Sequence, residues 1–122
     1  MSTATEHDGR GQTHRATFDA AREELRGDIR RGAGGRTALE RYSDRVDGLL
    51  RQVFIEAGTS QVPVTIVALG GYGRRHLCLH SDIDVLVLVG GTLGPAEEKF
   101  ATAFLNPLWD LGVVVEIGRA HV

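Results

Sequence analysis

Cysteine is almost absent from this sequence, and so are lysine and long apolar runs. The single cysteine, Cys78, excludes an internal disulfide and a cysteine-based zinc site, so the reducing cytoplasm is the natural compartment. Lys99 is the only lysine, and a formal net charge of −2 gives no overall basic field to attract nucleic acid. No apolar stretch approaches the roughly 18 residues of a membrane span. These absences predict a cytoplasmic protein that binds neither nucleic acid nor membrane.

The first residues of the chain are polar. Residues 1–14 consist largely of Gly, Thr, His and charged residues, and they lack the apolar core of a signal peptide. Because such a segment offers nothing to bury, we expect a disordered tail over residues 1–14.

Two amphipathic helices are predicted over residues 15–58. In each of them apolar residues recur at steps of three and four, which places them on one side of a helix. The glycine-rich residues 32–35 separate the two patterns, and the second pattern ends near Gly58. We therefore expect an N-terminal helical hairpin that covers the rest of the domain. Its apolar stripes are Phe18, Ala21, Leu25 and Ile29, then Leu39, Tyr42, Val46, Leu49, Leu50, Val53 and Phe54.

Strand and helix patterns alternate over residues 59–115. Residues 62–69 and 82–89 are β-branched runs followed by glycine pairs, which is typical of buried strands. Between them the sequence Gly-Gly-Tyr-Gly makes a tight exit from the first strand, and residues 74–79 are long enough for about two helical turns. A third strand begins at residues 112–115. The expected fold class is α/β.

A further helix is predicted over residues 95–111, with phenylalanines and leucines on one side. Its Asn106-Pro107 pair either kinks the helix or restarts it, with Asn as the cap and Pro in the first turn.

Two acidic residues stand at the start of the second strand. In a strand, Asp82 and Asp84 share one face while Ile83 points to the other. Neighbouring carboxylates repel each other, so a cation should lie between them, and Mg²⁺ prefers carboxylate and phosphate oxygens. The alternative is that Asp82 only precedes the strand and Asp84 faces solvent at a sheet edge. The apolar runs on either side favour a central strand instead.

The glycine pair before these acids is a second and independent indication of a site. Gly70 and Gly71 leave no side chain where backbone amides and a helix N-terminus meet an anion. A glycine pair alone is weak support, because turns use it constantly. Together with the acids it predicts a phosphate loop beside a metal site. Arg74 and Arg75 either meet phosphate oxygens or decorate a short helix.

These motifs resemble a known signature. The segment LGGYGRR followed by SDID is similar to that of the DNA polymerase β-like nucleotidyltransferases, in which Gly-Gly or Gly-Ser precedes Asp-x-Asp by a spacer of about ten residues. More narrowly, ALGGYGRRHLCLHSDIDVLVLV followed by PLWDLGV resembles the N-terminal domain of the bacterial PII uridylyltransferase family, over about residues 64–115. The sequence departs from that family at His76, usually Glu, and at Leu79, often Pro. Neither departure touches the acids.

The resemblance implies a partial polymerase β-like nucleotidyltransferase fold. It also implies transfer of UMP from UTP to a tyrosine of the PII regulatory protein, with Mg²⁺ as the cofactor. It assigns Asp82 and Asp84 as catalytic and metal-binding residues, and Gly70, Gly71, Arg74 and Ser81 as nucleotide-binding residues.

Two alternatives remain open at this point. One is another polymerase β-like enzyme, such as a small-molecule nucleotidyltransferase or the glutamine synthetase adenylyltransferase, whose loop usually reads Gly-Lys-Leu-Gly-Gly. The other is a nucleotide-binding module without chemistry. The family resembled normally adds a third carboxylate from a later strand, then an HD domain and two ACT domains, and this sequence contains none of them.

The last seven residues differ from the family pattern. Relatives continue into a Gly-His-Ser-Val-Arg strand, whereas this chain ends EIGRAHV. That heptapeptide is the translation of an oligonucleotide containing the start of a common sequencing adapter. We therefore expect residues 116–122 to be non-native read-through and the chain to be a truncated fragment, inactive alone.

Overall fold

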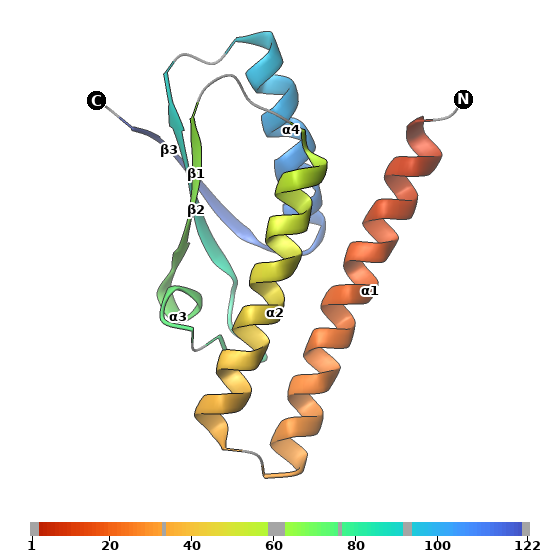
Figure 1. The fold of residues 1–122 in the computed structure, drawn as a ribbon, viewed down its shortest axis with the longest axis vertical. Coiled ribbons are helices and arrows are strands. Elements are labelled where there is room, and N and C mark those ends of the chain that lie inside the picture. Colours follow the sequence, from red (N-terminus) through yellow and green to blue (C-terminus); the bar gives the residue numbers. More distant parts are fainter. Residues whose placement is uncertain (1–2, 33, 59–62, 76, 92–93, 121–122) are drawn as a thin grey trace.

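The chain forms a helical layer against a small sheet (Figure 1). The computed structural model describes residues 3–32, 34–58, 63–75, 77–91 and 94–120. The elements in order are α1 (Thr3–Arg30), α2 (Gly35–Glu56), β1 (Val64–Leu69), α3 (Gly70–Gly73), β2 (Asp84–Gly90), α4 (Pro95–Asp110) and β3 (Val114–Ala120). The expected α/β class is confirmed.

The acid-bearing strand β2 lies in the middle of the sheet. The strand order is β1-β2-β3, with β1 antiparallel and β3 parallel to β2. Asp84 pairs with Leu69 on one side and with Val114 on the other. The predicted central position of this strand is confirmed, although β2 begins at Asp84, and Asp82 precedes it.

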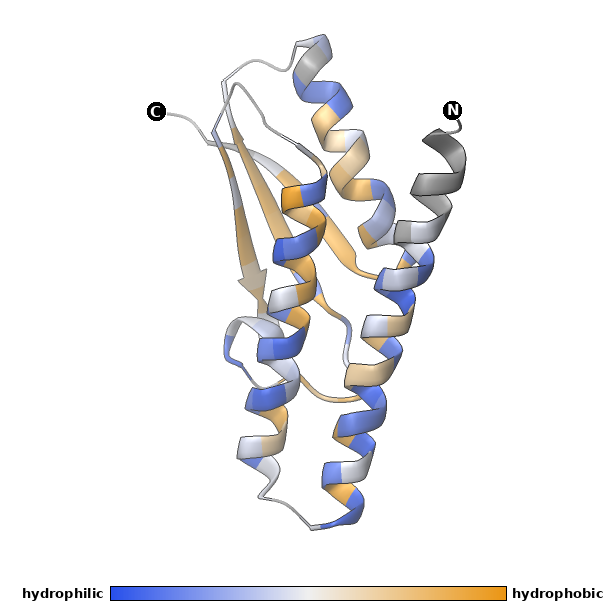
Figure 2. Cartoon of the chain, turned by 45° about the vertical axis from the view of Figure 1, so that its right-hand side comes forward, coloured by the Kyte–Doolittle hydropathy of each residue, from blue (hydrophilic) through white to orange (hydrophobic). Residues whose placement is uncertain are grey.

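One face of the sheet builds the core with the helices. Along β2 buried and half-buried residues alternate, so Val85, Val87 and Val89 belong to the core cluster while Leu86 and Leu88 do not. Helix α4 contributes Phe104 and Leu108, both almost completely buried. Figure 2 shows apolar residues along the strands and along the sides of the helices that face them. This packing follows from the two periodicities in the sequence.

The helical hairpin forms as expected, but its first helix is longer. Helix α1 begins at Thr3, which corrects the expected disordered tail over residues 1–14 from Thr3 onward. The structure supplies a reason in long-range contacts: His14 is buried, and its Nε2 lies 2.6 Å from Glu56 Oε2 on α2. The Arg15 guanidinium donates to the Asp110 carbonyl oxygen of α4 at 2.8 Å. Composition alone does not reveal such partners.

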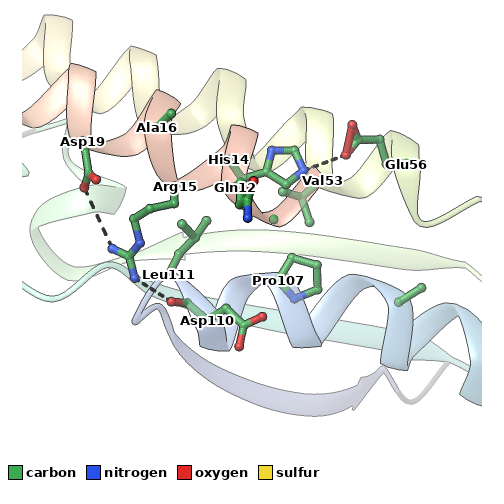
Figure 3. Close-up of a pocket in the computed structure, with 12 residues that line it drawn as sticks. Gln12, His14, Arg15, Ala16, Asp19, Val53, Glu56, Pro107, Asp110 and Leu111 are labelled. Carbon is green, nitrogen blue, oxygen red and sulfur yellow. Dashed lines mark hydrogen bonds and ion pairs between the residues drawn. The ribbon is translucent and has the colours of Figure 1, made fainter. Parts of the chain in front are cut away.

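These contacts border a groove of about 540 Å³ between α1, α2 and α4 (Figure 3). It lies within the helical layer, and none of the site residues predicted from the sequence lines it.

The remaining elements refine the sequence predictions. Helix α4 is continuous through Pro107, which excludes the restarted helix, while a kink at Pro107 stays a prediction. Strand β3 extends to Ala120, and residues 116–120 pair with β2. The origin of residues 116–122 stays a prediction, because pairing does not test it. Across the described ranges, no helix combines the length and apolarity needed to cross a bilayer.

Candidate functional site

We call the segment between β1 and β2, which begins with Gly70, the glycine loop. It turns the chain back on β1 immediately after Leu69. Gly70 has φ +58°, in the left-handed region that residues other than glycine rarely adopt. A β-carbon at Gly73 would lie 2.7 Å from the carbonyl oxygen of Ala68, which is closer than real contacts allow. Glycine at both positions therefore permits the one-turn helix α3 to fold against the strand that precedes it.

The segment after α3 is not the helix of about two turns that we expected over residues 74–79. Among the described residues, Arg75 is the one non-glycine residue with positive φ, at 57°, and this ends the helical path. The Leu77 amide then donates to the Ser43 hydroxyl of α2 at 3.1 Å, rather than to a helical carbonyl. A tertiary partner thus replaces the local hydrogen bond that a helix would have used.

The two acids lie where the sheet meets this loop. Ile83 is buried at 5% exposure, whereas Asp82 is exposed and Asp84 half-buried. Extended pairing with β3 already begins at Ile83, whose carbonyl accepts from the Val114 amide at 2.9 Å. Because neighbouring residues of an extended chain point to opposite sides, this burial pattern supports a shared outward face for both carboxylates.

Gly70 and Asp84 are direct neighbours. A β-carbon at Gly70 would lie 3.6 Å from Asp84 Oδ2, and the residue before it, Leu69, pairs with Asp84 across the sheet. The structure thus brings the start of the glycine loop next to one of the two acids, leaving the space beside that carboxylate free of a side chain.

The other predicted nucleotide-binding residues, Gly71, Arg74 and Ser81, lie in the segment between β1 and β2. Gly71 is half-buried inside α3. Arg74 and Ser81 are both exposed, and no hydrogen bond or ion pair joins either side chain to another residue in the described part of the chain. The described residues contain no group of three or more His, Cys, Asp or Glu placed to hold a metal.

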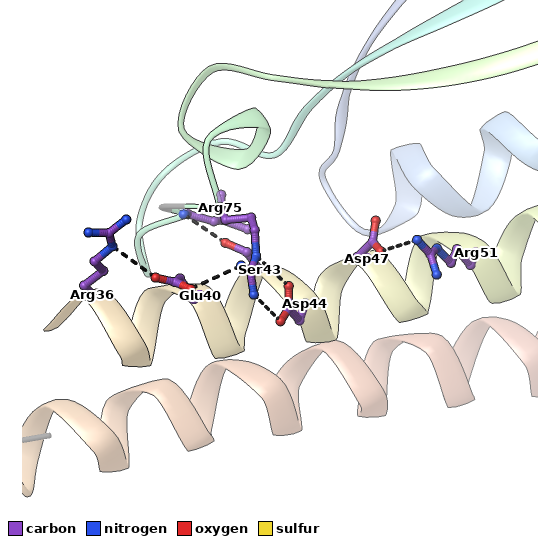
Figure 4. Close-up of polar contacts among 8 residues, drawn as sticks. Arg36, Glu40, Ser43, Asp44, Asp47, Arg51 and Arg75 are labelled. Atoms are coloured by element: carbon purple, nitrogen blue, oxygen red, sulfur yellow. Dashed lines mark hydrogen bonds and ion pairs between the residues drawn. The ribbon is translucent and has the colours of Figure 1, made fainter. Parts of the chain in front are cut away.

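Arg75 is engaged elsewhere. Its Nε and one terminal nitrogen donate to the two carboxylate oxygens of Asp44 at 3.0 and 2.7 Å, and its other terminal nitrogen lies 3.2 Å from Glu40 (Figure 4). The hydrogen bond from Arg75 lowers the pKa of Asp44. The sequence left two interpretations of this arginine open, a phosphate ligand or a decoration of a short helix, and the structure instead places it in an ion pair with α2.

Tyr72 is a further link to α2. Its ring is buried, and its hydroxyl donates to Asp47 at 3.4 Å. Burial raises the pKa of Tyr72 well above its usual value, and the negative charge of Asp47 raises it further. The phenol therefore stays protonated and keeps its donor role.

Sequence reasoning missed the residues of α2 that hold the loop. Glu40, Asp44 and Asp47 recur at steps of four and three, which places them along one side of the helix. Ser43 lies inside the apolar stripe, where a polar residue calls for a hydrogen-bond partner. Those two patterns were the available signal, but only the tertiary structure identifies their partners.

Comparisons with known proteins identify the family of the chain. The chain is 37% identical over 110 residues to a bifunctional uridylyltransferase/uridylyl-removing enzyme of Burkholderia lata, covering 88% of this chain and 12% of that protein. It is 44% identical over 83 residues to an enzyme of the same name from Haemophilus influenzae, covering 67% of this chain and 9% of the relative. The chain therefore belongs to a nucleotidyltransferase family, that of the bifunctional uridylyltransferase/uridylyl-removing enzymes.

The chain spans only about an eighth of the length of the Burkholderia relative. No family model matches it, and no solved structure matches it.

Proposed function

We propose that this chain is part of a polymerase β-like nucleotidyltransferase domain that transfers UMP from UTP to a tyrosine hydroxyl of the PII regulatory protein, releasing pyrophosphate. The observation that carries the proposal is the close approach of the loop to the acid, since a β-carbon placed on Gly70 would lie 3.6 Å from Asp84 Oδ2. A phosphate chain needs that close approach of backbone, together with a nearby carboxylate to share a cation. The names of the relatives support a uridylyl group as the group that is transferred.

The donor set fits Mg²⁺ shared with a substrate. Mg²⁺ takes one or two carboxylates and completes its shell with phosphate oxygens and water. Asp82 is exposed and Asp84 half-buried, so both carboxylates are accessible, and Gly70 adds no side chain beside them. When bound, the ion would neutralise triphosphate charge and lower the pKa of the attacking hydroxyl.

The chain's own residues have simpler tasks in this proposal. Asp82 and Asp84 hold the cation, and the backbone of Gly70 and Gly71 approaches the phosphates. Arg74 supplies an exposed guanidinium that forms no hydrogen bond or ion pair with a described residue. Ser81 offers a hydroxyl at the other end of the loop.

The test requires the full-length enzyme that carries this segment, with Mg²⁺, labelled UTP and a PII protein. Asp82→Asn removes one metal charge at constant volume, so we expect transfer to fall by about 10³-fold or more while thermal unfolding stays nearly unchanged. Asp110→Asn is the matched control, because this exposed aspartate at the end of α4 lies outside the site. Transfer by Asp82→Asn at a rate near that of the control would contradict the metal assignment.

The same assay separates the alternatives. Preferred transfer from ATP would indicate an adenylyltransferase-like enzyme, and nucleotide binding without transfer would indicate a non-catalytic module. We expect residues 1–122 alone to show no transfer, since the described residues do not gather a third acid beside Asp82 and Asp84, and two acids leave the metal pair under-coordinated. Transfer by this segment near the full-length rate would contradict that expectation.

A further inference from the structure

We infer that the acidic side of α2, made of Glu40, Asp44 and Asp47 together with Ser43, is a positioning surface that fixes the conformation of the glycine loop and thereby its affinity for the nucleotide phosphates. The nucleotide part of this inference rests on the proposed function. These α2 residues contact Tyr72, Arg75 and Leu77, none of which is a predicted catalytic or nucleotide-binding residue, so they act through other residues.

The Arg75 contacts are the centre of this surface. Arg75 adopts φ 57°, a conformation that costs energy for any residue with a β-carbon. It is held there by a bidentate ion pair with Asp44, and a third contact joins it to Glu40 at 3.2 Å. A planar guanidinium that meets one carboxylate with two nitrogens is fixed in orientation as well as in place. The ion pair therefore stabilises the backbone turn that ends α3.

Two further hydrogen bonds join the loop to α2 beside that ion pair. The Ser43 hydroxyl accepts a hydrogen bond from the Leu77 amide, and the Asp47 carboxylate accepts one from the Tyr72 hydroxyl. Figure 4 shows Glu40, Ser43, Asp44 and Asp47 following one another along α2. Loop residues 72, 75 and 77 are thus all tied to one rigid helix, and between Tyr72 and Arg75 lies Arg74.

This arrangement divides the tasks of the two neighbouring arginines. Arg75 faces two carboxylates that satisfy its charge, whereas Arg74 is exposed and pairs with no described residue. Arg75 is then a positioning residue, and Arg74 is the cation left to meet phosphate oxygens. A phosphate role for Arg75 would instead require its release from Asp44 and Glu40.

Hydrogen exchange tests the positioning without any nucleotide. In the full-length enzyme, the double variant Glu40→Gln/Asp44→Asn should speed exchange of the amides at residues 72–78 by roughly threefold to fivefold. This is the size of effect expected from losing an exposed but bidentate ion pair. Glu24→Gln is the matched control, because it removes a 2.6 Å ion pair with Arg45 that joins α1 and α2 away from the loop. Equal exchange in the double variant and the control would overturn the inference.

Kinetics then separate positioning from direct phosphate contact. If Arg75 acts through the α2 acids, Arg75→Gln and the double variant should each raise the KM for UTP about threefold to fivefold with little change in kcat, and combining them should add nothing further. If Arg75 binds phosphate directly, Arg75→Gln should cost much more than the double variant, which would overturn the division of tasks. Failure of the unsubstituted enzyme to use UTP would overturn the proposed function alone, because the exchange result needs no nucleotide.

Discussion

The Leu77 amide donates a hydrogen bond to the Ser43 hydroxyl oxygen at 3.1 Å, and both residues are almost completely buried, at 0% and 2% exposure. Ser43→Ala would leave that amide without a partner in the core. We expect the free energy of unfolding to fall by about 1–3 kcal/mol, measured by urea denaturation. Ser81→Ala, at an exposed serine, should change it by less than about 0.5 kcal/mol. A fall no larger than that of the control would mean that water replaces the lost hydroxyl.

Gly73 has no room for a side chain. The β-carbon of Gly73→Ala would meet the Ala68 carbonyl oxygen at 2.7 Å, so the backbone of β1 or α3 has to shift. We expect a loss of about 1–3 kcal/mol in unfolding free energy. Gly48→Ala is the opposite case, because Gly48 lies in the middle of α2 with open space around its β-carbon position. It should gain about 0.5–1 kcal/mol. Two changes of the same sign would contradict this geometry.

The ion pair of Asp44 makes a prediction about pH. Hydrogen bonding by Arg75 lowers the pKa of Asp44 in the folded chain, so its stabilising contribution is present above the ordinary carboxyl value of about 3.9 and is lost as pH falls through the lowered pKa. NMR titration of the Asp44 carboxyl should find a midpoint below that ordinary value. Arg75→Gln should return the midpoint towards it, and 1 M salt should shift it in the same direction because the group is exposed. An unchanged midpoint in Arg75→Gln would disprove the pairing in solution.

Most elements of the fold could be predicted from local patterns. The stripe from Leu39 to Phe54 predicted α2, and the β-branched runs predicted β1 and β2, because both patterns are strong and are broken at their ends by glycine. The start of α1 could not be predicted. Its first residues carry little helix preference, and the contact of His14 with Glu56 joins residues that are 42 apart in sequence.

The sequence indicated which acid and which glycine belong to the candidate site, but it did not indicate the residues that hold the loop in place. Asp84 and Gly70 were identified from the sequence, and the structure brings them together. The path after Gly73 was predicted wrongly as a helix, since residues 74–79 carry no local signal against one. What decides that path is the left-handed Arg75 and the α2 partners of residues 72–77, and such partners depend on how distant segments pack.

Two substitutions in the loop should separate strain from function. Gly70→Ala forces alanine into φ +58° and puts a methyl group 3.6 Å from Asp84 Oδ2. We expect a loss of about 1–2 kcal/mol in stability from the backbone strain, and a lower kcat/KM for UTP from the methyl group beside the carboxylate. Gly71→Val should lower kcat/KM further, because a β-branched side chain intrudes where backbone must approach phosphate.

Gly112→Ala is the matched control for Gly70→Ala. Gly112 has φ +80° and open space around its β-carbon position, and it lies in the turn between α4 and β3, outside the predicted site. It should therefore show a similar loss of stability while its kcat/KM for UTP in the full-length enzyme stays unchanged. Urea denaturation and steady-state kinetics on the three variants measure both quantities. If Gly70→Ala and Gly71→Val use UTP as well as Gly112→Ala does, the glycine loop has no part in binding the nucleotide, and the contact between Gly70 and Asp84 serves the fold alone.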